Sequence, residues 1–454
     1  MANPSASLEL NPKSSNVSIF GNVNTLSGVK RFTTSKVWTD ELLSKHLAIL
    51  HGFEAVAHRW YSRGISRQLE RTLAVIFAGF CAFLTVYATQ PILPVLRKAL
   101  DITAALASLT VTASTMGMAL TAPMAGRISD RIGRKKTIVM AGFGLAVSTL
   151  GAFTADGLYQ LLAWRFLQGV FTPGIFAVAI AYIHDEWGAA EAGRGTSYYV
   201  GGTVVGGFLG RFLAGIIASR YDWHYVFLVL GILNLMSALI IWRFMPVETK
   251  KGAPPAQGFW TAVGEHFRNP LLLATYAVGF CVFFSLISTF TYINFYLAQP
   301  PFSLSTTVLG SLFFVYLTSA VVTPIAGRYV DKYGHRLVLE CGIAAGACGI
   351  LLTLVPNVYV IILGLALVCN AVFVAQTCSN GFIGLATKTN RALAVGLYVM
   401  VYNIGGSTGA AAPGEVWKSY GWPGVVAMIV TVQVVTMLLA WRLWPGKQLA
   451  AVAK

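Results

Sequence analysis

The fold is decided by the stretch Gly126-Arg127-Ile128-Ser129-Asp130-Arg131-Ile132-Gly133-Arg134-Lys135-Lys136, which lies between two apolar runs. Both flanking runs are long enough to cross a membrane as helices. The stretch carries five cations, and so many positive charges in a short loop indicate the cytoplasmic side of a membrane.

The same pattern returns in the second half of the chain as Gly327-Arg328-Tyr329-Val330-Asp331-Lys332-Tyr333-Gly334-His335-Arg336. The residues directly before the two stretches also correspond, since Ala122-Pro123-Met124-Ala125 precedes the first and Thr323-Pro324-Ile325-Ala326 precedes the second. This duplicated G-R-x-x-D-[RK]-x-G-x-[RK] pattern resembles the signature loop of the major facilitator superfamily. In that family each six-helix half carries one copy, between its second and third helices.

Both copies contain the residue types that a conformational latch needs. Glycines allow a sharp turn and a close approach of helices. The Asp can face a helix N-terminus or nearby cations, in a contact that holds in one global state and breaks in another. The alternative is a solvated charge run that only sets topology. The predicted latch residues are Gly126, Arg127, Asp130, Arg131, Gly133, Arg134, Gly327, Arg328, Asp331, Gly334 and Arg336.

Composition indicates a membrane protein with many spans. The 454 residues are 56% hydrophobic and 11% charged, with a mean hydropathy of +0.66, whereas soluble domains carry about 25% charged residues. The net charge is +16. Most Lys and Arg fall on the segments predicted to be cytoplasmic, which indicates positive-inside topology rather than a nucleic-acid partner.

Twelve apolar segments predict an all-α membrane protein with 12 transmembrane helices in two six-helix pseudo-repeats. They lie at about 72–95, 105–126, 137–155, 158–184, 195–219, 224–244, 270–298, 306–327, 337–355, 358–386, 392–415 and 422–444. The expected domains are a cytoplasmic tail (1–70), an N-terminal bundle (71–244), a cytoplasmic linker (245–269), a C-terminal bundle (270–445) and a cytoplasmic tail (446–454). Parallel halves with a binding site between them at the membrane midplane are the expected architecture.

The first tail is polar at its start and lacks the apolar core of a signal peptide. An apolar stripe over Val37–Trp60 predicts either an amphipathic helix on the inner leaflet or a weakly structured tail. Its histidines are better explained as solvated residues than as metal ligands.

Two arginines fall inside predicted spans, where an unpaired cation is costly. Arg165 begins Arg165-Phe166-Leu167-Gln168-Gly169, which resembles the family's R-x-x-Q-G element. Arg211 should lie at a similar depth. We expect each to bind substrate, or else to bond helix carbonyls. Because all Asp and Glu fall in the tail, in loops or near helix ends, Arg211 also suggests an anionic or polar substrate.

Glycines recur every four residues in the fifth span, a spacing that lets helices pack backbone to backbone. The predicted packing residues are Gly202, Gly206 and Gly210, with Gly405 and Gly409 in the eleventh span. The first group resembles the antiporter motif G-x-x-x-G-P-x-x-G-G. It departs from the motif at Gly207, where Pro is usual, and at Arg211, where Gly is usual.

Polar and aromatic residues within the spans predict a cavity lining, because small-molecule sites combine apolar walls with a few hydrogen-bonding groups. Each could equally serve as a contact between helices. With the two arginines, the predicted lining is Tyr87, Gln90, Arg165, Tyr198, Arg211, Tyr292, Asn294, Gln376, Asn380, Tyr402 and Asn403. Pro91 and Pro94 should permit a bend near the outer end of the first span.

The chain shows no catalytic constellation, no nucleotide-binding G-x-x-x-x-G-K-[ST] loop and no cysteine pattern for zinc or disulfides. We therefore expect neither an enzyme nor a cofactor or metal. The resemblance covers about residues 70–445 and extends to bacterial arabinose-efflux-like or drug-efflux-like members. It implies export of small molecules across the bacterial inner membrane without a cofactor or nucleotide. We expect a proton-driven exporter that acts as a monomer and has both termini in the cytoplasm. The alternatives are a symporter that imports an organic anion or sugar, a transporter-like sensor and an organellar location. The proton site stays open between Asp130, the Asp185–Glu186 pair and Glu415.

Overall fold

The computed structural model describes residues 68–248, 258–387 and 390–444. Almost all of the predicted N-terminal tail, including the possible helix over Val37–Trp60, lies outside the described residues. The predicted C-terminal tail (446–454) and residues 249–257 of the linker also lie outside them. We call residues 68–248 the N-terminal half and residues 258–444 the C-terminal half.

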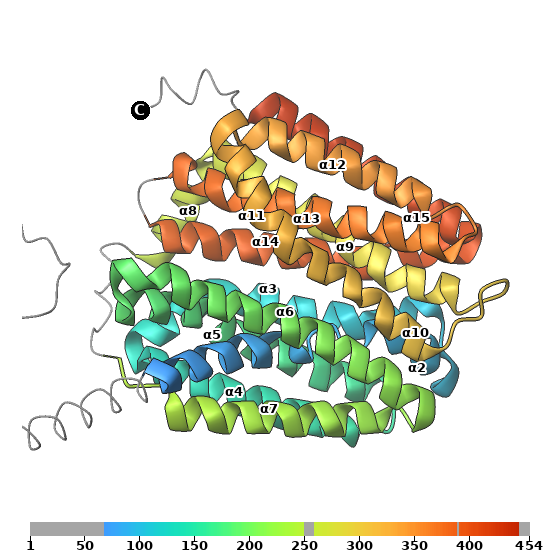
Figure 1. The fold of residues 1–454 in the computed structure, drawn as a ribbon, viewed down its shortest axis with the longest axis horizontal. Coiled ribbons are helices and arrows are strands. Elements are labelled where there is room, and N and C mark those ends of the chain that lie inside the picture. Colours follow the sequence, from blue (N-terminus) through green and yellow to red (C-terminus); the bar gives the residue numbers. More distant parts are fainter. Residues whose placement is uncertain (1–67, 249–257, 388–389, 445–454) are drawn as a thin grey trace, which may run out of the picture. The chain divides into compact units, whose positions relative to one another are not determined.

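All regular structure in the described ranges is helical, which confirms the predicted all-α class (Figure 1). A helix over residues 68–84 comes first. It is followed by η1 (Gln90–Ile92), α2 (Leu93–Ala99), α3 (Ala104–Ile132), α4 (Arg134–Phe153), α5 (Leu158–Glu186), α6 (Gly188–Arg220), α7 (His224–Phe244), α8 (Phe259–Arg268), α9 (Pro270–Leu297), α10 (Thr306–Ser311), η2 (Leu312–Phe314), α11 (Val315–Tyr333), α12 (His335–Leu352), α13 (Val358–Ala386), α14 (Arg391–Ala411) and α15 (Pro413–Leu443).

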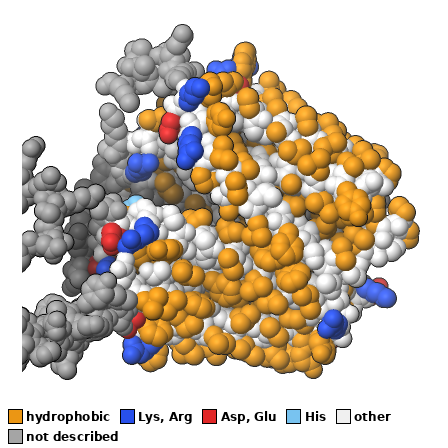
Figure 2. All heavy atoms as spheres, in the orientation of Figure 1, with side chains coloured by type: hydrophobic (Ala, Val, Ile, Leu, Met, Phe, Trp, Pro, Cys, Tyr) orange, Lys and Arg blue, Asp and Glu red, His pale blue; other side chains and the backbone are white. Residues whose placement is uncertain are grey.

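Among the described residues, ten helices are long and apolar enough to cross a membrane. The other two predicted spans, 72–95 and 392–415, correspond to the helix over 68–84 and to α14, and their crossing stays a prediction. Figure 2 shows hydrophobic side chains over the middle of the visible face and Lys and Arg toward its two ends. Large apolar side chains such as Met140, Trp242 and Val321 are exposed, which suits contact with lipid.

The first predicted span is interrupted where Pro91 and Pro94 led us to expect a bend. Residues 85–89 form turns, closed by bonds such as Ala88 N to Thr85 O (3.2 Å) and Gln90 N to Tyr87 O (3.1 Å). Since proline has no backbone N–H, Pro91 cannot donate to the carbonyl of Tyr87, which accepts from Gln90 N instead.

The signature stretch differs from its prediction as a loop, because most of it is helical. Residues 126–132 complete α3 and residues 327–333 complete α11. Only Gly133 (φ +101°) and Gly334 (φ +90°) separate these helices from α4 and α12. A single residue in this left-handed region, which glycine adopts without steric cost, is sufficient for the turn.

Two other segments are more structured than expected. The predicted linker contains the helix α8, which packs against α9 and α14. The predicted loop between the last two spans is also mostly helical. The helix α14 ends at Ala411, and α15 begins at Pro413 and continues to Leu443 with an interruption at Gly421 (φ +59°).

Glycines bring two helix pairs into backbone contact. A Cβ on Gly202, Gly206 or Gly210 of α6 would lie 2.2, 2.4 or 1.7 Å from a carbonyl oxygen of the helix over 68–84. A Cβ on Gly405 or Gly409 of α14 would lie 2.2 or 2.5 Å from a carbonyl of α9. The same kind of contact therefore joins the first helix to α6 and α9 to α14.

The two halves meet along α3 and α14, which lie side by side (Figure 1). The hydroxyls of Thr115 and Ser407 are 2.7 Å apart, and Thr112 Oγ1 donates to Ser407 O at 3.2 Å. Nearer the start of α3, the hydroxyl oxygens of Tyr292 and Ser108 are 3.3 Å apart. A second contact joins α6 to α10.

We predict that Gly210→Ala lowers the melting temperature of the purified protein. The new Cβ would overlap the Leu84 carbonyl, so α6 must shift, and overpacking costs about 1–3 kcal/mol. Gly201→Ala is the matched control on the same helix, because a Cβ there meets no atom within 4 Å. Equal melting temperatures for the two variants would contradict this packing.

Candidate functional site

Arg165 of α5 is fully buried and lies against the interruption that follows the first helix. A helix that ends leaves carbonyls without donors, and inside a membrane water cannot replace them. Arg165 Nη1 donates to Thr85 O at 2.8 Å and Nη2 donates to Val86 O. The guanidinium therefore satisfies part of the broken backbone.

The remaining donors of Arg165 are also used. Nε donates to Thr110 O (3.0 Å), Nη2 donates to Ser114 Oγ (3.1 Å), and Nη1 donates to Gln168 Oε1. Arg165 and Gln168 are the Arg and Gln of the R-x-x-Q-G element, and both are buried. These bonds fit the interpretation in which Arg165 holds helices together through their carbonyls.

Arg211 of α6 also lies beside this interruption and is only 4% exposed. Its Nε donates to Gln90 Oε1 at 2.9 Å, and its Nη1 donates to Gly207 O at 2.7 Å. No acidic residue is among the buried residues of the described ranges. The cation is therefore held without a buried carboxylate.

Three aromatic rings surround the Arg211 guanidinium. Its Cζ lies 4.8 Å from the ring centre of Tyr87, 4.8 Å from that of Phe313 and 4.7 Å from that of Tyr316. Tyr87 belongs to the N-terminal half, whereas Phe313 and Tyr316 belong to the C-terminal half. Aromatic faces attract cations, and the attraction is strongest where water is excluded.

Other predicted lining residues lie near this group or contribute to helix contacts. Tyr87 packs edge-on against Phe283 (6.3 Å), and Phe283 stacks on Tyr402 (4.0 Å). Tyr292 Oη donates to Ala410 O at 2.9 Å. Asn294 and Asn403 each donate to a carbonyl one turn back on their own helix.

The remaining predicted lining residues occupy different surroundings. Tyr198, on the early part of α6, is 38% exposed, and its ring centre lies 6.4 Å from that of Trp187. Asn380 is exposed and Gln376 is partly buried on α13. The structure thus gathers Tyr87, Gln90 and Arg211 but does not bring Tyr198 to them.

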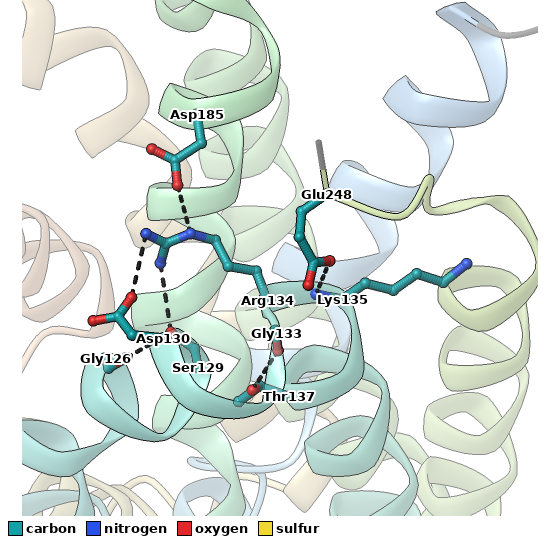
Figure 3. A network of polar contacts seen from close by, with 9 residues as sticks. All are labelled: Gly126, Ser129, Asp130, Gly133, Arg134, Lys135, Thr137, Asp185 and Glu248. Atoms are coloured by element: carbon teal, nitrogen blue, oxygen red, sulfur yellow. Dashed lines mark hydrogen bonds and ion pairs between the residues drawn. The ribbon is translucent and has the colours of Figure 1, made fainter. Parts of the chain in front are cut away.

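The first signature stretch is part of a polar network within the N-terminal half (Figure 3). Arg134 pairs with Asp185 of α5 and with Asp130 (3.5 Å). Glu248, just after α7, accepts a hydrogen bond from Lys135 N at 3.2 Å. Its carboxylate therefore lies at the N-terminus of α4, where unpaired N–H groups and the helix dipole favour a negative charge.

Of the two contacts expected for the aspartate of the latch, this arrangement shows the one with a cation. The residue facing a helix N-terminus is Glu248, whereas Asp130 lies beside a cation. A Cβ on Gly126 or Gly327 would meet no atom within 4 Å, so close packing does not explain these two glycines. Gly133 fits the turn and also leaves room for the Glu248 carboxylate.

The second signature stretch has different partners. Arg336 pairs with Glu340 one turn along α12, at 2.9 Å. Asp185 lies near the end of α5, but the last described turn of α13, which ends at Ala386, contains no acidic residue. The two signature stretches are therefore similar in sequence but form different ion pairs.

Arg127 connects the first signature stretch to the linker helix. Its Cζ lies 4.6 Å from the ring centre of Phe259 on α8. Since α8 packs against α9 and α14, this contact ties the stretch to the C-terminal half.

Sequence reasoning missed Phe313, Tyr316 and Glu248 as partners. The two rings lie within an ordinary apolar run, and only the packing of α10 and η2 against α6 shows their role. For Glu248, the available signal was an acid placed directly after a predicted span.

A model of the family described as Major Facilitator Superfamily matches residues 75–381 and 300–452. The chain belongs to the major facilitator superfamily. Members of this superfamily are membrane transporters rather than enzymes. The expected resemblance, the all-helical fold and the absence of enzymatic character are thereby confirmed.

Relatives over most of the chain are named as transporters. An uncharacterized transporter of Buchnera aphidicola subsp. Schizaphis graminum is 31% identical over 82% of this chain and 90% of its own. The inner membrane transport protein YnfM of Escherichia coli K12 is 30% identical over 85% and 93%. The multi-drug resistance efflux pump PmrA of Streptococcus pneumoniae is 26% identical over 58% and 68%.

A solved structure has the same fold. The crystal structure of a mutant of the nucleoside transporter NupG matches with a TM-score of 0.69 over 83% of this chain and all of that chain. The sequences are 15% identical, so this similarity concerns the fold alone.

We predict that Arg165→Met destabilises this superfamily member severely. It removes all five hydrogen bonds that the buried guanidinium makes to the turn, α3 and Gln168, at about 0.5–1.5 kcal/mol for each bond. Arg194→Met is the control, because Arg194 is about half exposed and pairs with Glu191 on the same helix. Melting temperature and the yield of monodisperse protein measure the effect; a stable Arg165→Met protein would contradict it.

Proposed function

We propose that the chain is a secondary active transporter that exports small organic molecules by alternating access, driven by the proton-motive force. The substrates would be sugar-like, anionic or drug-like. Membership of the superfamily supports transport, and similarity to PmrA, named as an efflux pump, supports export. Similarity to YnfM supports a bacterial inner membrane.

The observation that carries this proposal is the unequal contact of α6 with the C-terminal half. Near its end, a Cβ on Gly215 would lie 2.4 Å from Thr306 O of α10. The hydroxyls of Thr307 and Ser219 are 2.8 Å apart in the same region. In the predicted topology this end of α6 faces the outside.

The earlier part of α6 is more open. Tyr198 and Val200 are 38% and 48% exposed, and a Cβ on Gly201 would meet nothing within 4 Å. Contact of α6 with α10 at the outer end fits a state closed to the outside. A transporter in that state exchanges substrate with the cytoplasm, where an exporter loads it.

The proposed substrate site centres on Arg211, Tyr87 and Gln90, with Tyr292 and Asn294 from the C-terminal half. Rocking of the N-terminal half against the C-terminal half would expose this region to each side in turn. We include protons as the coupling ion, and a monomer as the functional unit, in this proposal.

The signature stretches would act as the latch that closes the cytoplasmic side in the opposite state. Asp130 suits this role because its partner Arg134 has a second carboxylate in Asp185. Arg134 can therefore stay paired while Asp130 exchanges partners during the transport cycle.

We predict that Asp130→Asn lowers transport at least tenfold while changing the melting temperature by less than about 2 °C, since a partly exposed ion pair contributes about 0–1 kcal/mol. Asp156→Asn is the control, because Asp156 is an exposed acid in the loop before α5. Unchanged flux in Asp130→Asn would remove the latch role.

Direction is tested in everted membrane vesicles with an acidic interior and labelled arabinose, benzoate and ethidium as probes. An exporter should accumulate at least one probe in everted vesicles, and a protonophore should abolish the accumulation. Asp130→Asn serves as the inactive comparison. Proton-driven accumulation in right-side-out vesicles instead would establish the importing symporter.

A further inference from the structure

The two buried guanidinium groups differ in how completely their donors are used. Arginine has five N–H groups in a fixed fork. Arg165 donates to five acceptors, whereas Arg211 donates to two, through Nε and Nη1. Arg211 Nη2 makes none of the hydrogen bonds found among the described residues.

Arg211 also lacks a counter-charge within the described residues. None of the ion pairs there involves it, and no Asp or Glu there is buried. A buried charge is normally paired. The three rings stabilise the cation from their faces, but they cannot accept the in-plane hydrogen bonds that Nη2 offers.

A second donor without a partner lies beside this cation. Gln90 is fully buried, and its Oε1 accepts from Arg211 Nε. Its Nε2 has no hydrogen-bond partner among the described residues. The Oη of Tyr316, whose ring faces the guanidinium, is likewise buried without a partner there.

A carboxylate matches this set of donors. It has two oxygens that accept several hydrogen bonds, and charge-assisted bonds to guanidinium are short and strong. One group could accept from Arg211 Nη2 and from Gln90 Nε2. A neutral amide has one acceptor oxygen and no charge, and a cation would be repelled by Arg211.

We propose that Arg211 and Gln90 bind the carboxylate of an organic monoanion whose body is apolar or aromatic. Tyr87 and Phe313 supply ring faces beside the carboxylate. The ring contacts continue from Tyr87 to Phe283 and then to Tyr402. This inference deepens the proposed function and rests on it for the role of the anion in transport.

The proposal is tested by thermal shift on the purified full-length protein with benzoate, benzamide, inorganic phosphate and chloride. A ligand that binds the folded state raises stability according to ln(1 + [L]/Kd). Benzoate should stabilise the protein. Benzamide, which has nearly the same shape but is neutral, and the two inorganic anions should bind with a Kd at least tenfold higher than that of benzoate.

Three variants locate the binding. Arg211→Met should abolish the thermal shift caused by benzoate. Gln90→Leu should raise the Kd for benzoate about tenfold, the factor expected from losing one hydrogen bond to a charged group. Gln433→Leu is the control, since Gln433 is also a buried glutamine with an unpartnered amide atom, but on α15. Its benzoate response should equal that of the unmodified protein.

A benzoate response that is absent from the unmodified protein, or that survives in both Arg211→Met and Gln90→Leu, overturns the proposal. Equal stabilisation by phosphate, chloride and benzoate overturns the proposal that the site selects an organic monoanion. If Arg211→Met does not fold, Gln90→Leu against Gln433→Leu decides alone. Arg211-dependent binding of benzoate without transport of any probe in vesicles would uphold this site and reject the exporter. Transport of a probe without Arg211-dependent benzoate binding would uphold the exporter and reject this site.

Discussion

The central constraint on this molecule is the need to satisfy a broken helix inside a membrane-spanning bundle. The chain leaves α-helical geometry after residue 84 and returns to it at α2, with Pro91 in η1 and Pro94 in the first turn of α2. Arg165 resolves this by donating to the carbonyls of Thr85 and Val86. The same guanidinium bonds α3, so a single buried cation fixes the relative positions of three segments. The turn that it stabilises carries Tyr87 and Gln90, which face Arg211.

Close packing of helix backbones brings the buried polar side chains of the bundle within hydrogen-bonding distance of neighbouring helices. Glycines of α6 approach the helix over 68–84 until its carbonyls touch them, and α14 approaches α9 in the same way. Such contacts gain dispersion energy and bring side chains of adjacent helices within reach of one another. Arg211 follows directly after Gly210, one of these contact points, which explains how it reaches Gln90 across the helix pair.

Hydropathy was sufficient to predict the all-helical class and most spans, because a bilayer requires a long apolar run for each helix. The duplicated stretch predicted the turns at Gly133 and Gly334, although both stretches are largely helical. The absence of buried acids near Arg165 and Arg211 also predicted that these cations need other partners. The partners themselves, Val86 for Arg165 and Tyr316 for Arg211, depend on the rotation and register of neighbouring helices. Local sequence patterns do not determine those.

The two halves contribute different chemistry despite their shared topology. Both buried guanidinium groups of the described residues belong to the N-terminal half, and the acids that pair with the first signature stretch do as well. The C-terminal half supplies Phe313 and Tyr316 to the central group. If the halves rock apart at their outer end, as proposed, Arg211 would lose two of its three rings while keeping Gln90 and Gly207 on its own side. The energetic environment of this cation would then differ between the two states, and any group that pairs with it would shift the balance between them.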